Sequence, residues 1–585
     1  MLSLSWAADV VGRMLFAGTT LLVVYSLASP ALADPPSGDD LAGKVHAFST
    51  SGEFTRAMEV AGQIPDRAAR DDAYATVSKF QMGAGLNGPA VETASYVSDD
   101  QARSKMLTDI ALKRQSRAAG APGGAVEPDF ESLMELITTT VQPESWEELG
   151  GPGTIAPFET GVYVDSQGTL RRITQLKDNT LLSTIHQAAR TATANTSLAV
   201  ASPLRKVSLT RLEKEAQLRW AMGKPPTDEM LYLAGIYEVK YILVYPEQNE
   251  IVLAGPAGAW QANAEGRVVN QDTGRPVLHL DDLVVLLRNA VSENGRFGCA
   301  ITPTQEGLKK AQEYLAQTSD KPLHPRQRDG WLKGLRDAIG KQEIDVYGIS
   351  PETRAGRILV EADYHMKRIG MGLEDGTAGV PSYLEMVTIP PDGSPPPMDV
   401  LRWWFTLNYR AVQGTKDRNA FELVGPGVQV QSENELLDDQ GNRIHTGASS
   451  SLNSTFARNF TKEYAALSVK YPIYGELKNI FDLALACSLM EKERMADQVG
   501  WHMTHFNKSY QVSTAPVPKD VETIMNMRVI DRKHIIAGVS GGVRFDPSEI
   551  LTAENLKIDE YGLMKADHQA SKSPENLPHH GWWWD

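Results

Sequence analysis

The 585-residue sequence has only two cysteines, Cys299 and Cys487. Neither lies near a histidine in the sequence, so the spacing supports neither a thiol nucleophile nor a zinc centre built on cysteine. Each cysteine lies in an apolar segment, where a lone thiol behaves as a small hydrophobic side chain. In an exported chain the two could instead form a disulfide. The sequence leaves both alternatives open.

An excess of basic residues is also missing. The formal net charge is −15, with a pI of about 5.4. Because phosphate binding needs clustered Lys and Arg, this balance argues against nucleic acid as a partner. Hydrophobic residues make up 42% and charged residues 22%, which is typical of globular domains with real cores. The length predicts three or four of them.

Long uncharged apolar runs are absent after the amino terminus. There, Arg13 precedes an apolar run over residues 14–27, and Ala31, Leu32 and Ala33 place small residues at cleavage positions. We expect residues 1–33 to be a signal peptide, so that the mature protein is periplasmic or displayed on the cell surface without a transmembrane segment. An uncleaved membrane anchor is the alternative.

Residues 34–120 show an internal repeat. Residues 56–61 align with 89–94, and Asp66 and Arg70 align with Asp99 and Arg103, all at an offset of 33. A period near 34 residues with small side chains at packing positions resembles tetratricopeptide-type helical hairpins. Such a region is either a groove for a partner or a structural adaptor.

The rest of the chain predicts α+β modules. We expect a small α+β module at 121–175, a central α+β domain at 176–320, a second at 321–500 and a C-terminal extension and tail at 501–585. In the central domain, apolar runs at 239–245 and 251–254 flank a polar turn, which predicts a hairpin. Asp281 or Asp282 is expected to cap the next helix, and Thr302 the helix after the strand at 297–301.

The second domain predicts a β-meander closed by two helices. Trp403, Phe405, Leu407 and Tyr409 alternate with mostly polar neighbours, which indicates one buried face. Phe421 and Leu423 are expected to meet Val428 and Val430 across the turn at 425–427. Earlier, strands at 161–165 and 169–173 flank a turn at 166–168.

Several phrases resemble a known but uncharacterised family. They include the Gly-Gly-Pro-Gly turn at 150–153, Gly274-Arg275-Pro276, the run at 361–367 and the pair Trp403-Trp404. Together they resemble a family of exported proteins from planctomycete bacteria that is catalogued as a domain of unknown function. The resemblance covers about residues 125–495 and implies no activity, ligand or catalytic residue.

One motif has the spelling of a serine nucleophile elbow. Residues 538–542 read Gly-Val-Ser-Gly-Gly around Ser540. The elbow requires a helix after the serine, whereas Val543, Arg544 and Phe545 predict a continuing strand. We therefore expect a glycine-permitted bend and no catalytic role.

Other polar pairs are open to two interpretations. His502 and His505, with His579 and His580 near the end, could contribute to a zinc site or be exposed polar residues. Asp363 and Lys367, like Glu361 and His365, are four apart on a predicted helix and could transfer protons or simply stabilise the helix.

Two groups of tryptophans could bind partners. Trp403 and Trp404 should face opposite sides of a sheet, one buried and the other free to stack on a sugar or a protein. Trp582, Trp583 and Trp584 follow a polar stretch and predict a tethered peptide that docks on this chain or on a partner.

No group of residues specifies a catalytic, cofactor or metal site, and no cofactor is predicted. We expect a non-catalytic exported scaffold or binding protein of the cell envelope, with a protein or glycan partner. The alternative is a hydrolase whose site has no visible motif.

Overall fold

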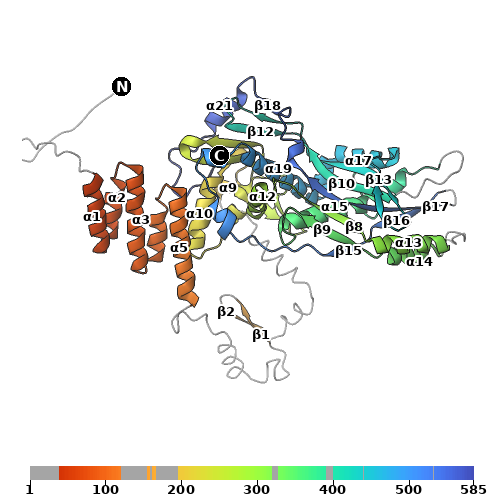
Figure 1. The fold of residues 1–585 in the computed structure, drawn as a ribbon, viewed down its shortest axis with the longest axis horizontal. Helices are drawn as coiled ribbons and strands as arrows, with labels where there is room; N and C mark the ends of the chain where they lie inside the picture. The colour runs from red at the N-terminus through yellow and green to blue at the C-terminus, as the bar shows by residue number, and fades with distance from the viewer. Residues whose placement is uncertain are drawn as a thin grey trace, which may run out of the picture.

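The computed structural model describes residues 38–119, 154–158, 161–165, 196–318, 327–389, 400–438, 440–530 and 533–585. The predicted signal peptide, the turn at 150–153 and most of the 121–175 module lie outside the described residues. The described residues form helices and several sheets (Figure 1), so the predicted α+β class is confirmed. No helix in these described ranges is long and apolar enough to cross a membrane.

Five helices stand side by side at one end of the molecule (Figure 1). They are α1 (Gly38–Thr50), α2 (Phe54–Gly62), α3 (Arg67–Gly83), α4 (Asn87–Ala94) and α5 (Asp100–Ala119). Ala57 and Ala61 of α2 and Ala90 and Ala94 of α4 are fully buried, as the repeat predicts. Small side chains at these positions let neighbouring helices approach closely.

The 33-residue offset also appears in the polar contacts. The Asp66 carboxylate accepts the Ala69 amide at 2.8 Å, and Asp99 accepts the Ala102 amide at 2.7 Å. Arg70 Nη1 donates to the Ile64 carbonyl, and Arg103 Nη1 to the Val97 carbonyl. Each unit therefore starts its second helix with an aspartate cap, which satisfies otherwise unpaired amides.

The bounds of the remaining helices and strands are as follows. The helices are α9 (Thr196–Ala199), α10 (Leu209–Ala221), α11 (Asp228–Leu231), α12 (Leu280–Ser292), α13 (Gln305–Thr318), α14 (Arg328–Ile339), α15 (Arg354–Gly370), α16 (Tyr383–Met386), α17 (Ser451–Lys462), α18 (Tyr464–Lys470), α19 (Pro472–Lys492), α20 (Met495–Gln498) and α21 (Leu563–Ala570). The strands are β1 (Thr154–Phe158), β2 (Gly161–Asp165), β3 (Ser202–Ser208), β4 (Tyr241–Tyr245), β5 (Glu250–Ala257), β6 (Trp260–Ala262), β7 (Val268–Asn270), β8 (Phe297–Pro303), β9 (Lys341–Tyr347), β10 (Val400–Asn408), β11 (Ala411–Gly414), β12 (Ala420–Val424), β13 (Gly427–Leu437), β14 (Arg443–His445), β15 (Asp520–Glu522), β16 (Met525–Ile530), β17 (Lys533–Phe545), β18 (Leu556–Ile558) and β19 (Trp583–Trp584).

Two large sheets form the centre of the fold. One has eight strands, in the order β14-β13-β10-β17-β8-β9-β15 with β16 paired to β17. The other has seven, in the order β18-β11-β12-β4-β5-β3-β19. Both draw strands from before residue 320, from 321–500 and from after 500. The predicted boundaries at 320 and 500 therefore run through both sheets.

One continuous hydrophobic core joins the two sheets. It contains Ile242 and Leu253 of the seven-stranded sheet, Trp403 and Phe405 of the eight-stranded sheet, and the apolar sides of α12, α15 and α19. The hairpin predicted in the central domain is confirmed, because β4 pairs antiparallel with β5. The predicted strand at 297–301 is also confirmed as β8.

The predicted helix caps differ from those observed. His279, rather than an aspartate, precedes α12, because Asp281 accepts the Tyr510 hydroxyl at 2.8 Å and buried Asp282 pairs with Arg354. Thr304, rather than Thr302, caps α13 by accepting the Gly307 amide at 3.0 Å. At α12, tertiary contacts occupy both aspartates, so neither caps the helix. At α13, strand β8 extends to Pro303, so the cap moves from Thr302 to Thr304.

The predicted meander is wrong in one pairing. Strand β12, which carries Phe421, pairs with β11 and β4, whereas β13, which carries Val428, pairs with β10. The chain crosses between the sheets at Gly425, where a Cβ would lie 2.7 Å from Tyr409 Cα. Only glycine permits this approach, so the turn changes sheets instead of closing a hairpin. Similarly, β2 pairs with β1, and the predicted partner strand at 169–173 lies outside the described residues.

The C-terminal tail folds back onto its own chain. Strand β19 pairs antiparallel with β3, and the Ser208 amide donates to the Trp582 carbonyl at 2.9 Å. Trp582 and Trp584 are both buried, and they belong to different hydrophobic clusters. Of the two docking places that the sequence left open, the structure shows this chain's own sheet.

Candidate functional site

A cleft of about 440 Å³ lies where the helical array, α10 and the tail meet. The volume falls within the range of small-molecule sites. The lining residues come from five separate segments of the chain. They are Arg67, residues 95–100 and Arg103 of the array, Thr210, Arg211, Lys214 and Glu215 of the α10 region, Gln248, Asn249 and Glu250 after β4, residues 499–502, and His579, His580 and Gly581 of the tail.

A pair of stacked rings forms one wall of this cleft. The His579 imidazole lies parallel to the Tyr96 ring, with centroids 4.5 Å apart and an angle of 11° between the planes. Tyr74 lies near the same ring, with centroids 5.6 Å apart, and Tyr96 as a whole remains 42% exposed. An exposed aromatic ring with a polar edge is a surface on which a sugar or another flat group can stack.

The protonation state of His579 follows from its contacts. Ser95 Oγ donates to the Glu92 carbonyl at 2.6 Å and lies 2.8 Å from His579 Nε2. The serine proton is thus engaged, and Nε2–H of the imidazole donates to the serine oxygen. Burial, helped by the charge of Lys214, lowers the pKa of His579 to about 4, so the ring is neutral at pH 7. This arrangement does not activate Ser95 as a nucleophile, since the histidine is the donor.

Most charges in the cleft are paired. Arg103 binds Asp100, Arg211 Nε binds Glu250 at 2.6 Å, and His580 Nδ1 lies 2.9 Å from Glu215. Lys214 is different: among the described residues it makes no ion pair within 4 Å. Burial, together with the nearby charges of Arg103 and Arg211, lowers the pKa of Lys214 to about 7. Strong pKa shifts of this kind cluster at functional sites.

The fold places three of the four candidate zinc-binding histidines at the cleft and the fourth, His505, elsewhere. His502, His579 and His580 line the cleft, although the first is separated from the other two by more than 70 positions of chain. His505 is buried on the other side of its turn against Trp220, and burial lowers its pKa to about 4. His502 and His505 therefore do not face one site, and the spacing of three does not create a metal pair.

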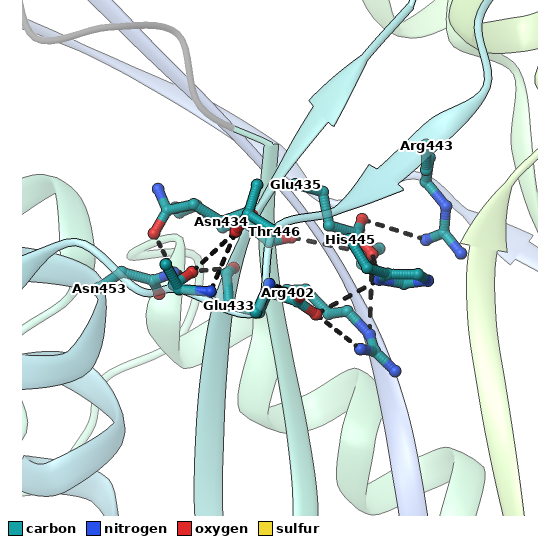
Figure 2. Close-up of polar contacts among 12 residues, drawn as sticks. Arg402, Glu433, Asn434, Glu435, Arg443, His445, Thr446 and Asn453 are labelled. Carbon is teal, nitrogen blue, oxygen red and sulfur yellow. Dashed lines mark hydrogen bonds and ion pairs between the residues drawn. The ribbon is translucent and has the colours of Figure 1, made fainter.

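The described residues do contain one group that could hold a metal ion, and no sequence spacing indicated it. Glu433 and Glu435 alternate on β13, and His445 is the cross-strand partner of Glu435 on β14 (Figure 2). His445 Nδ1 lies 3.0 Å from Glu435 Oε1 and 3.3 Å from Glu433 Oε2. Three donor atoms thus meet at the edge of the eight-stranded sheet.

Two arginines already neutralise this group. Arg402 binds Glu433 at 2.9 Å, and Arg443 lies 3.4 Å from Glu435 (Figure 2). Burial opposes ionisation of Glu433, but the Gly447 amide and Arg402 outweigh it and lower the pKa of this carboxyl. Because two guanidinium groups balance the two carboxylates, the group has no excess negative charge to attract a cation. We interpret the group as an ion-pair network that fixes β14 to the sheet.

Ser540 belongs to the buried side of the same network. It lies inside β17, is 1% exposed and donates to Glu435 at 3.2 Å. The strand continues to Phe545, as the sequence predicts, so no elbow forms. Ser540 contacts Glu435, and Glu435 in turn contacts His445. Serine catalysis instead needs an imidazole next to the hydroxyl.

The two helical pairs have different structural roles. Asp363 and Lys367 form an ion pair at 2.6 Å and are both fully buried between α15 and the sheet. Burial raises the pKa of Asp363 despite the lysine. Glu361 forms an ion pair with Arg267, and His365 Nδ1 lies 2.7 Å from the Tyr474 hydroxyl. Glu361 and His365 therefore each have another partner.

The remaining candidates are also placed. Trp403 is fully buried, while Trp404 lies on the opposite face with the Arg402 guanidinium 4.5 Å from its ring, so the predicted division between faces is confirmed. Cys299 and Cys487 are buried free thiols, so the disulfide alternative is wrong. The sequence missed Tyr96 and Lys214; only the repeat, which aligned Arg103 with Arg70, pointed to their neighbourhood.

Residues 299–383 match a family described as a protein of unknown function (DUF1598). The match begins in β8, passes through α13, α14, β9 and α15, and ends at Tyr383. It covers much less of the chain than the resemblance over residues 125–495, and it contains none of the residues that line the cleft. No curated protein and no solved structure matches the chain.

Proposed function

We propose that this chain is a non-catalytic binding protein of the cell envelope and that its cleft binds a short carbohydrate. The observation that carries the proposal is the stack of His579 on Tyr96, which is still 42% exposed, in a cleft that Gln248 and Asn249 also line. Carbohydrates are bound by such combinations, because the apolar face of a sugar packs on an aromatic ring while its hydroxyls need donors and acceptors.

A carbohydrate fits the cleft better than a peptide does. Peptide recognition uses a free sheet edge for main-chain pairing or apolar pockets for side chains. Here the β3 edge of the seven-stranded sheet is already occupied by β19, and the cleft is bordered by paired charges such as Arg211 and Glu250. The helical array, which resembles tetratricopeptide-type repeats, would then act as one wall of the cleft.

Binding without hydrolysis is favoured over the alternative of a hydrolase. A glycosidase usually needs two carboxyl groups on opposite sides of the bond, one of them protonated. In the cleft, Glu215 lies 2.9 Å from His580 Nδ1 and Glu250 binds Arg211, so both carboxyl groups already have partners. Ser95, which lies beside His579 in the cleft, donates its hydroxyl to the Glu92 carbonyl and accepts a hydrogen bond from the ring, so the histidine does not act as its base.

An exported location is part of the proposal. It is supported by the apolar run at residues 14–27 and by the small residues before Asp34. An origin in planctomycete bacteria is likewise proposed from the phrases at 274–276 and 361–367. N-terminal sequencing of the protein from its native host should find Asp34 first; Met1 would contradict cleavage.

The test is a binding panel of neutral and acidic oligosaccharides, measured by calorimetry. Wild type should bind at least one, and Tyr96→Ala should weaken binding at least tenfold. Tyr561→Ala is a matched control, because Tyr561 is 89% exposed and does not line the cleft. Chromatography of the bound sugar should show no cleavage. Binding to none of the panel, equal binding by Tyr96→Ala, or release of shorter products would contradict the proposal.

A further inference from the structure

We infer that the cleft selects an acidic carbohydrate, whose carboxylate, sulfate or phosphate group is bound by Lys214 between Arg103 and Arg211. This inference rests on the proposed carbohydrate function and names the chemical class of its ligand. It depends on one cationic side chain of the cleft, Lys214, which makes no ion pair in the described part of the chain.

Three cations meet at this part of the cleft. Arg211 and Lys214 are three residues apart on α10, so they share one face of the helix. Arg103 approaches from α5, and each of these side chains lines the cleft. Three cationic side chains from two elements therefore lie at one part of the cleft, and two of them are paired with carboxylates.

The two arginines form ion pairs with acidic partners, whereas the lysine forms none with the residues that the structure describes. Arg103 binds Asp100 and Arg211 binds Glu250 at 2.6 Å. Lys214 also feels the carboxylates of Glu215 and Glu92, but both of these lie against His580, at 2.9 and 3.4 Å. An anionic group on a ligand would therefore complete the ion-pair pattern instead of displacing a partner.

The electrostatics of Lys214 support this assignment. Burial and repulsion by Arg103 and Arg211 lower its pKa, and the weaker influence of Glu215 and Glu92 does not offset them. A bound anion favours the charged ammonium and would raise that pKa again. Binding of an acidic ligand is therefore coupled to proton uptake, so affinity should fall as the pH rises from 6 to 9. Affinity for a neutral ligand should not change with it.

The experiment compares trigalacturonate with galactotriose at pH 6, 7.5 and 9. Wild type should prefer trigalacturonate at least tenfold at pH 6 and lose most of this preference at pH 9. Lys214→Met should abolish the preference, because it removes the cation that binds the acidic group. Lys214→Arg should keep the preference and remove its pH dependence, since arginine stays protonated. Lys557→Met is the matched control, because this exposed lysine lies away from the cleft.

The outcomes separate this inference from the proposed function. Equal binding of the two sugars by wild type, or an unchanged preference in Lys214→Met, would overturn the acidic-ligand inference and leave the carbohydrate function standing. Binding of neither sugar, nor of any sugar in the panel, would overturn both. Circular dichroism and the melting temperature of each variant should equal those of wild type. If Lys214→Met does not fold, the Lys214→Arg pH profile still decides the question.

Discussion

The Arg205 guanidinium binds both carboxylate oxygens of Asp585, the last residue of the sequence, at 2.8 and 3.0 Å. Arg205 is fully buried, and its other donors reach the carbonyls of Leu198, Val200 and Ala234. A buried arginine needs such a full set of acceptors, because an unpaired charge in the interior is strongly destabilising. The pair therefore fixes the tail, including His579 and His580, at the cleft.

Replacement of Asp585 by asparagine should lower stability in a pH-dependent way. Burial alone would raise the pKa of Asp585, but hydrogen bonds from Arg205 and Ser202 and the nearby charges outweigh it and lower that pKa. The contribution is then complete above the ordinary aspartate pKa of about 4 and is lost as the pH falls through the lower folded value. At pH 7 we expect Asp585→Asn to destabilise by about 1 kcal/mol, allowing for partial exposure.

Thermal unfolding of Asp585→Asn and wild type at pH 7 and pH 2.5 measures this contribution. The difference in melting temperature should be present at pH 7 and should shrink at pH 2.5, where the wild-type carboxyl takes up a proton. An equal difference at both values would show that the charge of Asp585 does not stabilise the tail.

The tryptophans of the tail should contribute unequally to stability. Trp584 packs with Tyr241, Tyr245 and Val252 on one face of the seven-stranded sheet. Removal of a buried tryptophan typically destabilises by about 3–5 kcal/mol. We expect Trp584→Ala to approach this value and Trp583→Ala, which removes a partly exposed ring beside Arg205, to cause a smaller loss. Chemical denaturation of both variants tests this order; the reverse order would contradict the docked arrangement of β19.

Overpacking should destabilise the helical array. Ala90 is fully buried in α4, so Ala90→Leu must push neighbouring helices apart and should destabilise by about 1–3 kcal/mol. Ala102→Leu adds the same atoms at an exposed position of α5 and should change stability by less than about 0.5 kcal/mol. Urea unfolding monitored by circular dichroism compares them. A neutral Ala90→Leu would refute close packing at the repeat positions.

Two glycines of β17 form a matched pair. At Gly541 the φ angle is +157°, and a Cβ would lie 1.6 Å from the Trp403 carbonyl oxygen of β10. At Gly538 the nearest atom to a new Cβ is 4.0 Å away. Gly541→Ala should therefore destabilise by more than about 3 kcal/mol, at the upper end for overpacking, while Gly538→Ala should be nearly neutral. Equal melting temperatures would contradict the parallel pairing of β10 and β17.

Local periodicity predicted many elements correctly. The alternation of Trp403, Phe405 and Leu407 predicted β10, and the apolar runs around the turn at 246–249 predicted the β4–β5 hairpin. The 33-residue offset predicted buried Ala57 and Ala90. These signals depend on which face of one helix or strand is apolar, and sequence spacing contains that information directly.

Features that depend on distant contacts were not predictable. Phe421 and Val428 lie on either side of the turn at 425–427, yet they belong to different sheets, because Gly425 lets the chain pass close to the backbone of Tyr409. The cleft brings Tyr96 beside His579 across more than 480 positions. No local pattern encodes that meeting, which arises only when β19 pairs with β3 and Arg205 binds Asp585.

The claim that the cleft binds a carbohydrate is tested most directly by a crystal structure of the protein soaked with an oligosaccharide that binds in solution. We predict density for a sugar ring in contact with Tyr96 and His579, with its hydroxyls near Gln248 or Asn249. Sugar density at Trp404 on the eight-stranded sheet, together with an empty cleft, would contradict the proposed binding site.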